Sequence, residues 1–312
     1  MRRTGRPHDR PVDPARRARL VYLRRRVTAV AVPAVVTVVL LLILDGQAPG
    51  SRAARTLGTG TGDTARSAPR SAISPPGGAG GGGFSSELLQ NERVHYTSYI
   101  AAGSTRHREI ALTFDDGPSA FTLPILAVLE RYRVKATFFE IGRQVSADPG
   151  YTAALARAGM AIGDHTQSHP PMAELSSTQQ AVEIDQAAQA IRAAGAPRPL
   201  VWRPPYGSFN ATTLELLRAR EMIMALWTVD TSDYARPGIP RIIYTALSGA
   251  RPGAIILFHD GGDDRSQTVA ALPRIIQRLQ QRGYRLVTVP QLLLDDPPPT
   301  DQPPPHNLSG SG

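Results

Sequence analysis

Residues able to carry acid–base or metal-binding chemistry stand in short clusters in the middle of this sequence. Two neighbouring aspartates, Asp115 and Asp116, lie in the stretch TFDDGP. Adjacent carboxylates repel each other, so the pair calls for a cation or a division of roles. His165 and His169 stand four residues apart in HTQSH, a spacing that on a helical turn would bring both imidazoles to one metal ion. Two histidines and one aspartate could form a three-ligand site for a zinc-like ion, with an open position for water.

A metal site would also give the two aspartates different roles. One carboxylate could bind the cation while the other stays free to accept a proton, and the cation would offset their repulsion. Each cluster taken singly also allows a structural interpretation. The aspartates could cap a helix near Ser119, the histidines could hold a turn at Pro170-Pro171, and the lone His259 could be a core residue.

The clusters lie between apolar runs that alternate with helical patterns about seven times. The predicted strands are 110–114, 135–142, 160–163, 200–202, 222–229, 254–258 and 284–289. The predicted helices are 121–133, 151–159, 176–195, 210–220, 240–249 and 268–283, with Ser176 as a cap of the third and Gly195 as its stop. Such alternation predicts a parallel sheet with helices outside it, either an open doubly wound sheet or a barrel.

Each polar cluster follows the C-terminal end of one predicted strand. The residues concerned are Asp115 and Asp116, His165 and His169, Arg203, Asp230 and Asp233, and His259 and Asp260. The C-terminal ends of parallel strands face one side of the fold, where active sites lie. We therefore expect the five clusters to converge on one mouth.

Five stretches, TFDDGP, HTQSH, RPPYG, DTSDY and LFH, resemble in this order the motifs of the polysaccharide deacetylase family. This family is also called carbohydrate esterase family four or the chitooligosaccharide deacetylase homology domain. The resemblance covers about residues 107–295 and implies an α/β fold, a distorted and incomplete (β/α) barrel with about seven parallel strands. It also implies a divalent metal, with Zn²⁺ expected and Co²⁺, Ni²⁺ or Mn²⁺ as alternatives. The implied reaction removes N-acetyl groups from amino sugars of peptidoglycan, chitin or a related polymer, and releases acetate and a free amine.

The resemblance assigns the metal and the base to particular residues. Asp116, His165 and His169 would bind the metal. Asp115 would be the catalytic base that takes a proton from water, and Arg203 would orient it and pair with its charge. A planar guanidinium suits a bidentate contact with that carboxylate.

Five further residues take roles in the acid step and in substrate binding. His259 would be the catalytic acid that protonates the leaving amine, and Asp233 would raise its pKa by favouring the imidazolium. Tyr206 would offer a backbone N–H to the oxyanion, as well as a substrate contact. Leu257 would line the pocket for the acetyl methyl group. Tyr234 stands where the family usually has tryptophan, which bears on groove shape and substrate preference.

The N-terminal part of the chain predicts a membrane anchor. Residues 1–26 hold ten arginines and two acidic residues, a net charge of +8 out of the chain's +9, which leaves +1 for the rest. An uncharged stretch of 18 residues follows at 27–44, close to the lower limit for a membrane-spanning helix. The flanking arginines place residues 1–26 in the cytoplasm and the remainder outside the cell membrane. The alternative is a cleaved signal peptide, which would make the protein secreted.

The remaining segments complete the predicted organisation. Residues 45–85 are rich in Gly, Ser and Pro and predict a disordered linker, and 296–312 predict a disordered Pro-rich tail after a deacetylase domain at 86–295. The near-neutral charge after residue 26 argues against a nucleic-acid partner. We expect a monomer whose partners are an N-acetylated glycan polymer and the membrane. Two other functions stay open: a metal-dependent amidohydrolase of a small amide, and an inactive glycan-binding domain.

Overall fold

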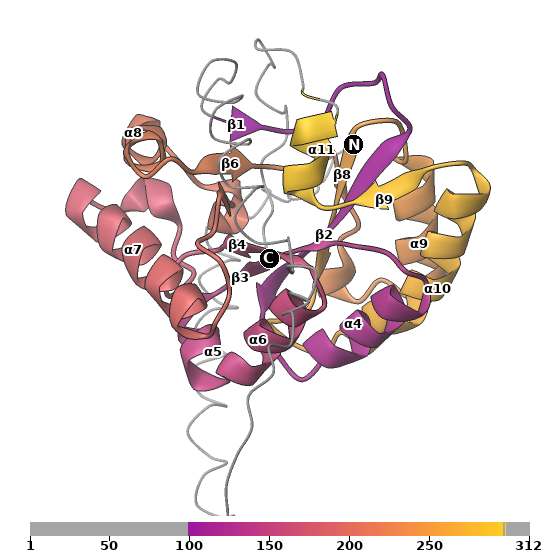
Figure 1. Cartoon of the computed structure of the whole chain (residues 1–312), viewed down its shortest axis with the longest axis horizontal. Helices are drawn as coiled ribbons and strands as arrows, with labels where there is room; N and C mark the ends of the chain where they lie inside the picture. Colours follow the sequence, from indigo (N-terminus) through magenta and orange to yellow (C-terminus); the bar gives the residue numbers. More distant parts are fainter. Residues whose placement is uncertain (1–98, 296, 298–312) are drawn as a thin grey trace, which may run out of the picture. The chain divides into compact units, whose positions relative to one another are not determined.

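The computed structural model describes residues 99–295 and residue 297. Within them, nine parallel strands form one sheet in the order β1-β6-β5-β4-β3-β2-β8-β7, and β9 pairs with the beginning of β2 (Figure 1). The strands are β1 (Tyr99–Ile100), β2 (Glu109–Gly117), β3 (Thr137–Glu140), β4 (Ala161–Asp164), β5 (Val201–Trp202), β6 (Ile223–Ala225), β7 (Val229–Asp230), β8 (Ala254–His259) and β9 (Arg285–Val287).

Helices connect most of these strands, as a parallel sheet requires. They are α4 (Thr122–Arg131), α5 (Gly142–Ala147), α6 (Pro149–Arg157), α7 (Ser177–Ala193), α8 (Ala211–Ala219), α9 (Ile239–Ser248), α10 (Ser266–Gln281) and α11 (Val289–Asp295). In the described part of the chain, three short 3₁₀ helices lie in loops: η1 (Met172–Glu174), η2 (Pro205–Gly207) and η3 (Asp233–Ala235). The predicted cap of α7 is confirmed, because Ser176 and Gln179 form a reciprocal capping box.

The sheet is curled, and its strand order shows why. β6 lies next to the edge strand β1 at one end of the order, whereas β7 is the last strand at the other end. Yet only residues 226–228 separate β6 from β7, and so short a segment spans at most about 14 Å. The two ends of the sheet must therefore approach each other, which gives the curled, incomplete barrel that the resemblance implies.

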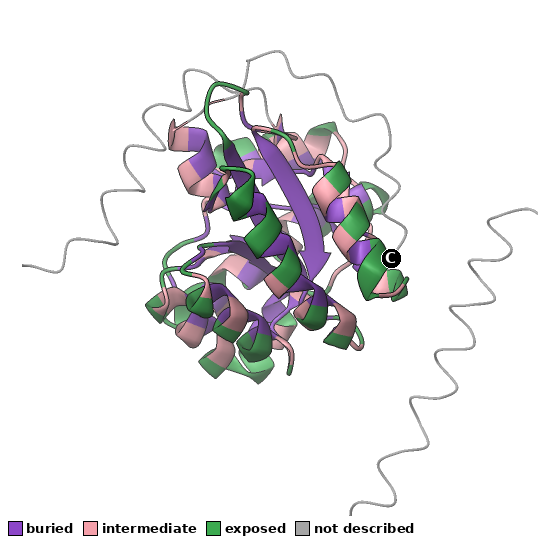
Figure 2. Ribbon diagram, turned by 90° about the vertical axis from the view of Figure 1, so that its right-hand side faces the viewer, coloured by how far each residue is buried: buried purple, intermediate pink, exposed green. Residues whose placement is uncertain are grey.

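The central strand β2 is buried on both faces. Ile110, Leu112 and Phe114 belong to an apolar cluster that includes side chains of α4, α6, α9 and α10, whereas Ala111 belongs to a second cluster on the opposite face. Figure 2 shows the strands buried while the surrounding helices are buried on one side only. Strands buried on both faces read as continuous apolar runs, as the sequence of β2 does.

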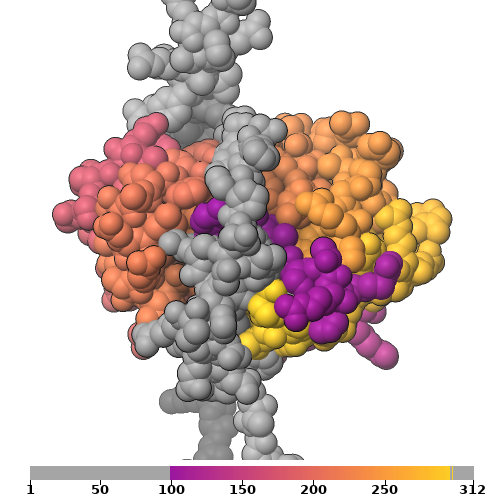
Figure 3. All heavy atoms as spheres, turned by 90° about the horizontal axis from the view of Figure 1, so that it is seen from above, coloured from indigo at the N-terminus to yellow at the C-terminus, as the bar shows by residue number. Residues whose placement is uncertain are grey.

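The two ends of the described chain lie side by side, as Figure 3 shows for residues just after 99 and the yellow residues near 290. The backbone N–H of Arg285 donates to the carbonyl of Arg108 at 2.8 Å. Gly103 packs so closely on α11 that a Cβ there would lie 2.9 Å from Cγ of Leu292. These contacts fix the first loop against β9 and α11, at the end of β2 opposite to the polar clusters.

The predicted alternation of strands and helices is confirmed, with four differences in detail. The predicted strand 222–229 is two strands, β6 and β7, which pair with different neighbours. β1, α5 and α11 were not predicted, because two-residue strands and helices of six or seven residues carry too little periodicity.

No helix among residues 99–295 is long and apolar enough to cross a bilayer. The predicted anchor 27–44, the linker 45–85 and all but one residue of the tail 296–312 lie outside the described residues. Those assignments stay predictions.

A buried carboxyl at the end of β3 makes stability depend on pH. Glu140 is fully buried; burial raises its pKa to about 8, although the Thr152 hydroxyl donates to it at 2.8 Å. A raised pKa means that the neutral form stabilises the fold below the ordinary value of 4.5, and that this contribution is lost as pH rises towards about 8.

We therefore expect Glu140→Gln, which cannot ionise, to gain thermal stability relative to the native protein as pH rises. Melting temperatures measured at pH 5 and pH 8.5 should show a difference of several degrees that grows in favour of the variant at the higher pH. A difference of the same size at both pH values would show that Glu140 ionises normally in the folded protein.

Candidate active site

The structure brings the five polar clusters together at the C-terminal ends of neighbouring strands. Asp115 is near the end of β2, and His259, the last residue of β8, is its partner in register. His165 follows β4 and Arg203 follows β5, whose ends pair through Asp164 and Trp202. The sequence-based expectation of a single mouth is met by this geometry.

A bulge in β2 lets both aspartates serve the same site. In a regular strand, Asp115 and Asp116 would point to opposite faces. Here the register with β3 shifts between Asp115 and Gly117, and Asp116 adopts a left-handed conformation with φ 72°. Asp116 is thus the extra residue of the bulge, and its side chain turns towards the histidines instead of into the core.

Three side chains gather in a group that could hold a metal ion. Oδ1 of Asp116 lies 3.0 Å from Nε2 of His169 and 3.5 Å from Nε2 of His165, and the three donor atoms all lie within 4.8 Å of one another. Ligand atoms about 2.1 Å from a tetrahedral ion lie about 3.4 Å apart, so these separations fit one cation.

The chemistry of this donor set also fits a divalent cation. Oδ1 of Asp116 is buried and accepts no hydrogen bond from any described residue, which is a costly state for a carboxylate without a cation. Nδ1 of His165 lies 2.8 Å from the carbonyl of Arg203, and Nδ1 of His169 lies 3.1 Å from the hydroxyl of Tyr206. With a proton on each Nδ1, both Nε2 lone pairs face Asp116, as metal-binding histidines require.

Electrostatics agree with an ionised Asp116. Burial raises the pKa of this carboxyl, but the imidazoles of His165 and His169 outweigh burial and hold the pKa well below its usual range. An ionised carboxylate is the form in which Asp116 would bind a divalent metal.

Asp115 is held apart from the metal group by a buried arginine. Arg203 is completely buried, and its NH1 donates to Oδ1 of Asp115 and to Oγ1 of Thr113, both at 2.8 Å. The other donors of the guanidinium bond the carbonyls of Ala225 and Leu226. Oδ2 of Asp115 stays on the side of the metal group, 3.8 Å from Nε2 of His165.

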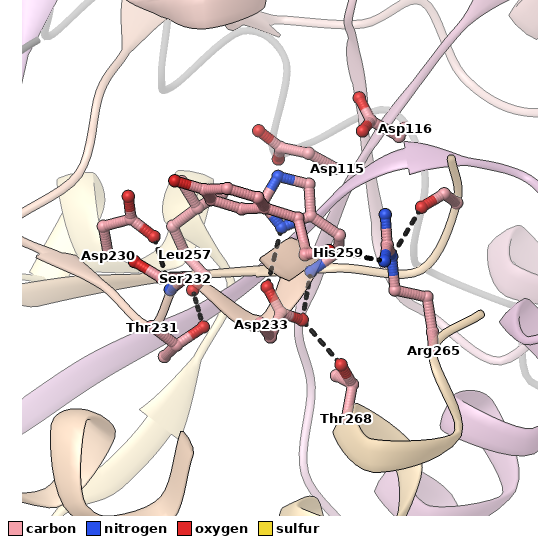
Figure 4. A network of polar contacts seen from close by, with 12 residues as sticks. Asp115, Asp116, Asp230, Thr231, Ser232, Asp233, Leu257, His259, Arg265 and Thr268 are labelled. Atoms are coloured by element: carbon pink, nitrogen blue, oxygen red, sulfur yellow. Dashed lines mark hydrogen bonds and ion pairs between the residues drawn. The ribbon is translucent and has the colours of Figure 1, made fainter. Parts of the chain in front are cut away.

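His259 and Asp233 form a second charged pair on the neighbouring strand. Nδ1 of His259 lies 2.8 Å from Oδ1 of Asp233, and the backbone N–H of His259 donates to Oδ2 at 2.9 Å (Figure 4). Burial lowers the pKa of His259, but Asp233, with Asp116 and Asp115 behind it, raises the pKa to about 9. His259 is thus an imidazolium at neutral pH.

The wall beside this pair is formed by Leu257, Tyr234 and Asp230. Leu257 shares the face of β8 with His259, two residues away, and is buried at the register position of Asp230. The ring of Tyr234 stands edge-on to the imidazole of His259, with centroids 5.2 Å apart. Asp230 accepts a hydrogen bond from the backbone N–H of Ser232 and is half-buried.

The structure corrects two details of the sequence-based site. The segment from His165 to His169 is not a helical turn; Thr166 and His169 have left-handed backbones, and this irregular loop brings the imidazoles together. The contact of Arg203 with Asp115 is a single hydrogen bond and not a bidentate one, because its other donors bond backbone carbonyls and Thr113.

Three contacts of the site were missed in the sequence analysis. The hydroxyl of Tyr206 contacts His169, whereas the sequence analysis gave Tyr206 a backbone donor and a substrate contact. Arg265 and Thr268 reach the segments that carry His259 and Asp233. A charged and a polar residue at the start of a predicted helix give no signal for such roles, since most arginines and threonines there are exposed.

Comparison with known proteins places this architecture in a family. The family model for polysaccharide deacetylase matches residues 102–225. A chitooligosaccharide deacetylase of Bradyrhizobium sp. (strain ANU 289) is 38% identical over 200 residues, covering 59% of this chain and 90% of that protein.

Solved structures agree with this assignment. The crystal structure of a peptidoglycan N-acetylglucosamine deacetylase matches with a TM-score of 0.62 and 31% identity, covering 67% of this chain and 97% of that one. A pseudoenzyme of carbohydrate esterase family 4 from Bacillus anthracis matches with a TM-score of 0.60 and 30% identity, covering 65% of this chain and 70% of that one. The chain belongs to the polysaccharide deacetylase family.

Replacing one proposed ligand tests the metal group directly. We expect His169→Ala to weaken zinc binding by about 100-fold or more, because loss of an outer partner of a ligand alone costs about 10- to 100-fold. Bound zinc per chain, measured by mass spectrometry of metals after dialysis, and affinity from calorimetry report the change. The exposed His107 is a matched control, since His107→Ala should leave both values unchanged. Equal metal content in His169→Ala and the native chain would contradict the ligand assignment.

Proposed function

We propose that this chain is a metal-dependent N-deacetylase of an extracellular glycan. Membership of the polysaccharide deacetylase family makes it a hydrolase of N-acetyl groups on polysaccharides. The observation that carries the proposal is the pairing of a three-residue cation group with a separate carboxylate, Asp115, held beside it by a buried arginine. This division between neighbouring aspartates supplies a ligand and a base in one place.

The group formed by Asp116, His165 and His169 would hold the cation. When bound, a divalent cation supplies Lewis-acid chemistry, which polarises the amide carbonyl and acidifies water. Asp115 accepts the proton of the attacking water through Oδ2, since Oδ1 is held by Arg203. Arg203 thereby orients the base and offsets its charge without reaching the substrate.

His259 completes the reaction from the strand next to Asp115. As the bond from the carbonyl carbon to water forms and the C–N bond breaks, His259 gives its Nε2 proton to the nitrogen, so the products are acetate and a free amine. Asp233 holds the opposite ring nitrogen and stabilises the imidazolium before transfer. The backbone N–H of Tyr206 is the proposed donor to the oxyanion; Tyr206 lies beside His169 in a left-handed conformation with φ 58°.

The proposed substrate is an N-acetylated amino-sugar polymer such as peptidoglycan or chitin. The names of the relatives support both polymers, and Leu257 and Tyr234 form a wall suited to an acetyl group. The proposed anchor at 27–44 and linker at 45–85 would hold the domain outside the cell membrane, within reach of wall glycan. Zn²⁺ is the proposed native ion for a site of two histidines and one carboxylate.

Acetate release from purified peptidoglycan and chitin oligomers, with and without a chelator, tests the proposal. Asp115→Asn should reduce turnover by about 10²- to 10⁴-fold while bound zinc is retained, because only the base is lost. The exposed Asp148 provides a control, and Asp148→Asn should keep full activity. No release from any glycan by the native chain would favour an inactive binding domain, as in the pseudoenzyme relative, and turnover confined to small amides would favour an amidohydrolase.

The pH profile tests the acid. Because His259 must be protonated to act, and its pKa is raised to about 9, activity should fall as pH rises through about 9. Asp233→Asn removes the strongest of the groups that raise this pKa, so the fall should move to lower pH by at least one unit, with a lower maximum. Rates measured from pH 6 to 10.5 give both curves. Identical curves would show that another group sets the alkaline limit.

A further inference from the structure

The first turn of α10 reaches the pair formed by His259 and Asp233 from outside the five sequence motifs. The hydroxyl of Thr268 donates to Oδ2 of Asp233 at 2.6 Å, and both residues are 1% exposed. Figure 4 shows Asp233 between His259 on one side and Thr268 on the other. Thr268 does not line the wall formed by Leu257 and Tyr234, so its effect on the reaction must pass through Asp233.

The Asp233 carboxylate has two contacts with His259 and one with Thr268. Oδ1 faces Nδ1 of His259, and Oδ2 accepts from the backbone N–H of the same residue. Among the described residues, the Thr268 bond is the contact with this carboxylate that does not come from His259. It therefore fixes the rotation of the carboxylate about its Cβ–Cγ bond independently of His259, and the side chain of Asp233 keeps its direction while the imidazole gains and loses a proton.

Arg265, just before α10, connects the two segments that carry this pair. Its Nε donates to the carbonyl of Gly261 at 2.7 Å, and NH1 lies 3.4 Å from the carbonyl of Tyr234. Gly261 follows His259 by two residues, and Tyr234 follows Asp233 directly. Arg265 is 3% exposed and has no carboxylate within 4.0 Å among the described residues, so backbone carbonyls are its acceptors.

Glycine at position 261 permits this approach. A Cβ at Gly261 would lie 1.9 Å from the carbonyl oxygen of Asp116, so no other residue could bring the loop so close to β2. The loop from His259 to Arg265 thus packs against the bulge and delivers the start of α10 beneath the imidazole.

From these contacts we propose that the first turn of α10 positions the general acid: Thr268 orients the Asp233 carboxylate, and Arg265 holds the two backbone segments together. Thr268 is thus a positioning residue for the proton transfer by His259. The inference rests on the proposed deacetylase function and adds a residue that the family motifs in this sequence do not contain.

Thr268→Val tests the proposal, because valine keeps the shape of the side chain and removes only the hydroxyl. We expect kcat for acetate release to fall about tenfold, which corresponds to about 1.4 kcal/mol, with KM and bound zinc unchanged. Thr268→Ser, which keeps the hydroxyl, should restore most of kcat. Should the valine variant fold poorly, Thr268→Ala reports the same loss.

Thr152→Val is the matched control. It removes the same kind of bond, from a buried threonine hydroxyl to a buried carboxyl group, at Glu140 instead of Asp233. It should lower the melting temperature without lowering kcat. An equal loss of kcat in the two valine variants would overturn the proposal, as would an unchanged kcat in Thr268→Val.

Combination with Asp233→Asn shows whether Thr268 acts through that carboxylate. The valine change should cost much less in the Asp233→Asn background than in the native chain, because the group it orients is already altered. Full multiplication of the two effects would contradict the proposed route. Absence of acetate release by the native chain would instead refute the proposed function, so the two failures are distinguishable.

Discussion

Two neighbouring carboxylates can serve one site only if the backbone between them leaves the alternation of a regular strand. Asp116 does so as the extra residue of a bulge, with φ 72° at a non-glycine position that ordinarily disfavours it. Gly117 follows because a Cβ there would lie 2.3 Å from the carboxylate of Asp260. The bulge turns Asp116 towards the two histidines and leaves Asp115 on the face shared with Arg203, so the division of roles depends on this one backbone feature.

The bulge directs the carboxylates of Asp115 and Asp116 to one site, where they repel each other. This repulsion is offset from two sides. Arg203 binds the far oxygen of Asp115 from within the sheet, and its planar group lies 4.0 Å over the ring of Phe139. His165 and His169 face Asp116 from the opposite side. Arg203 is fixed in place, because its remaining donors bond Thr113 and backbone carbonyls. A group that is fixed before substrate arrives needs little reorganisation during the reaction.

The sequence predicted the parts of the site that depend on strand ends, and missed those that depend on loop geometry. Apolar runs located β2, β4 and β8 well enough to place Asp115, His165 and His259 at one edge. Periodicity carries no information on left-handed residues, so the spacing of His165 and His169 was interpreted through a helical turn, whereas an irregular loop brings them together. The contacts of Arg265 and Thr268 arise when the start of α10 packs against η3 and the loop after β8, a tertiary effect that no local pattern in the sequence records.

The charge at the site is smaller than its count of acidic residues implies. Glu140 and Asp260 stand on either side of Gly117, with Asp260 accepting from the hydroxyl of Thr122 at 2.5 Å. Burial raises the pKa of Glu140 to about 8, and burial with the nearby Asp116 and Asp115 raises that of Asp260 to about 7. Below about pH 7 both carboxyls are mostly protonated, which limits the negative charge at the end of β2. If Glu140 and Asp260 ionised, they would add repulsion that Arg203 and the histidines do not offset. The burial that lowers stability at high pH therefore also limits the negative charge of the site.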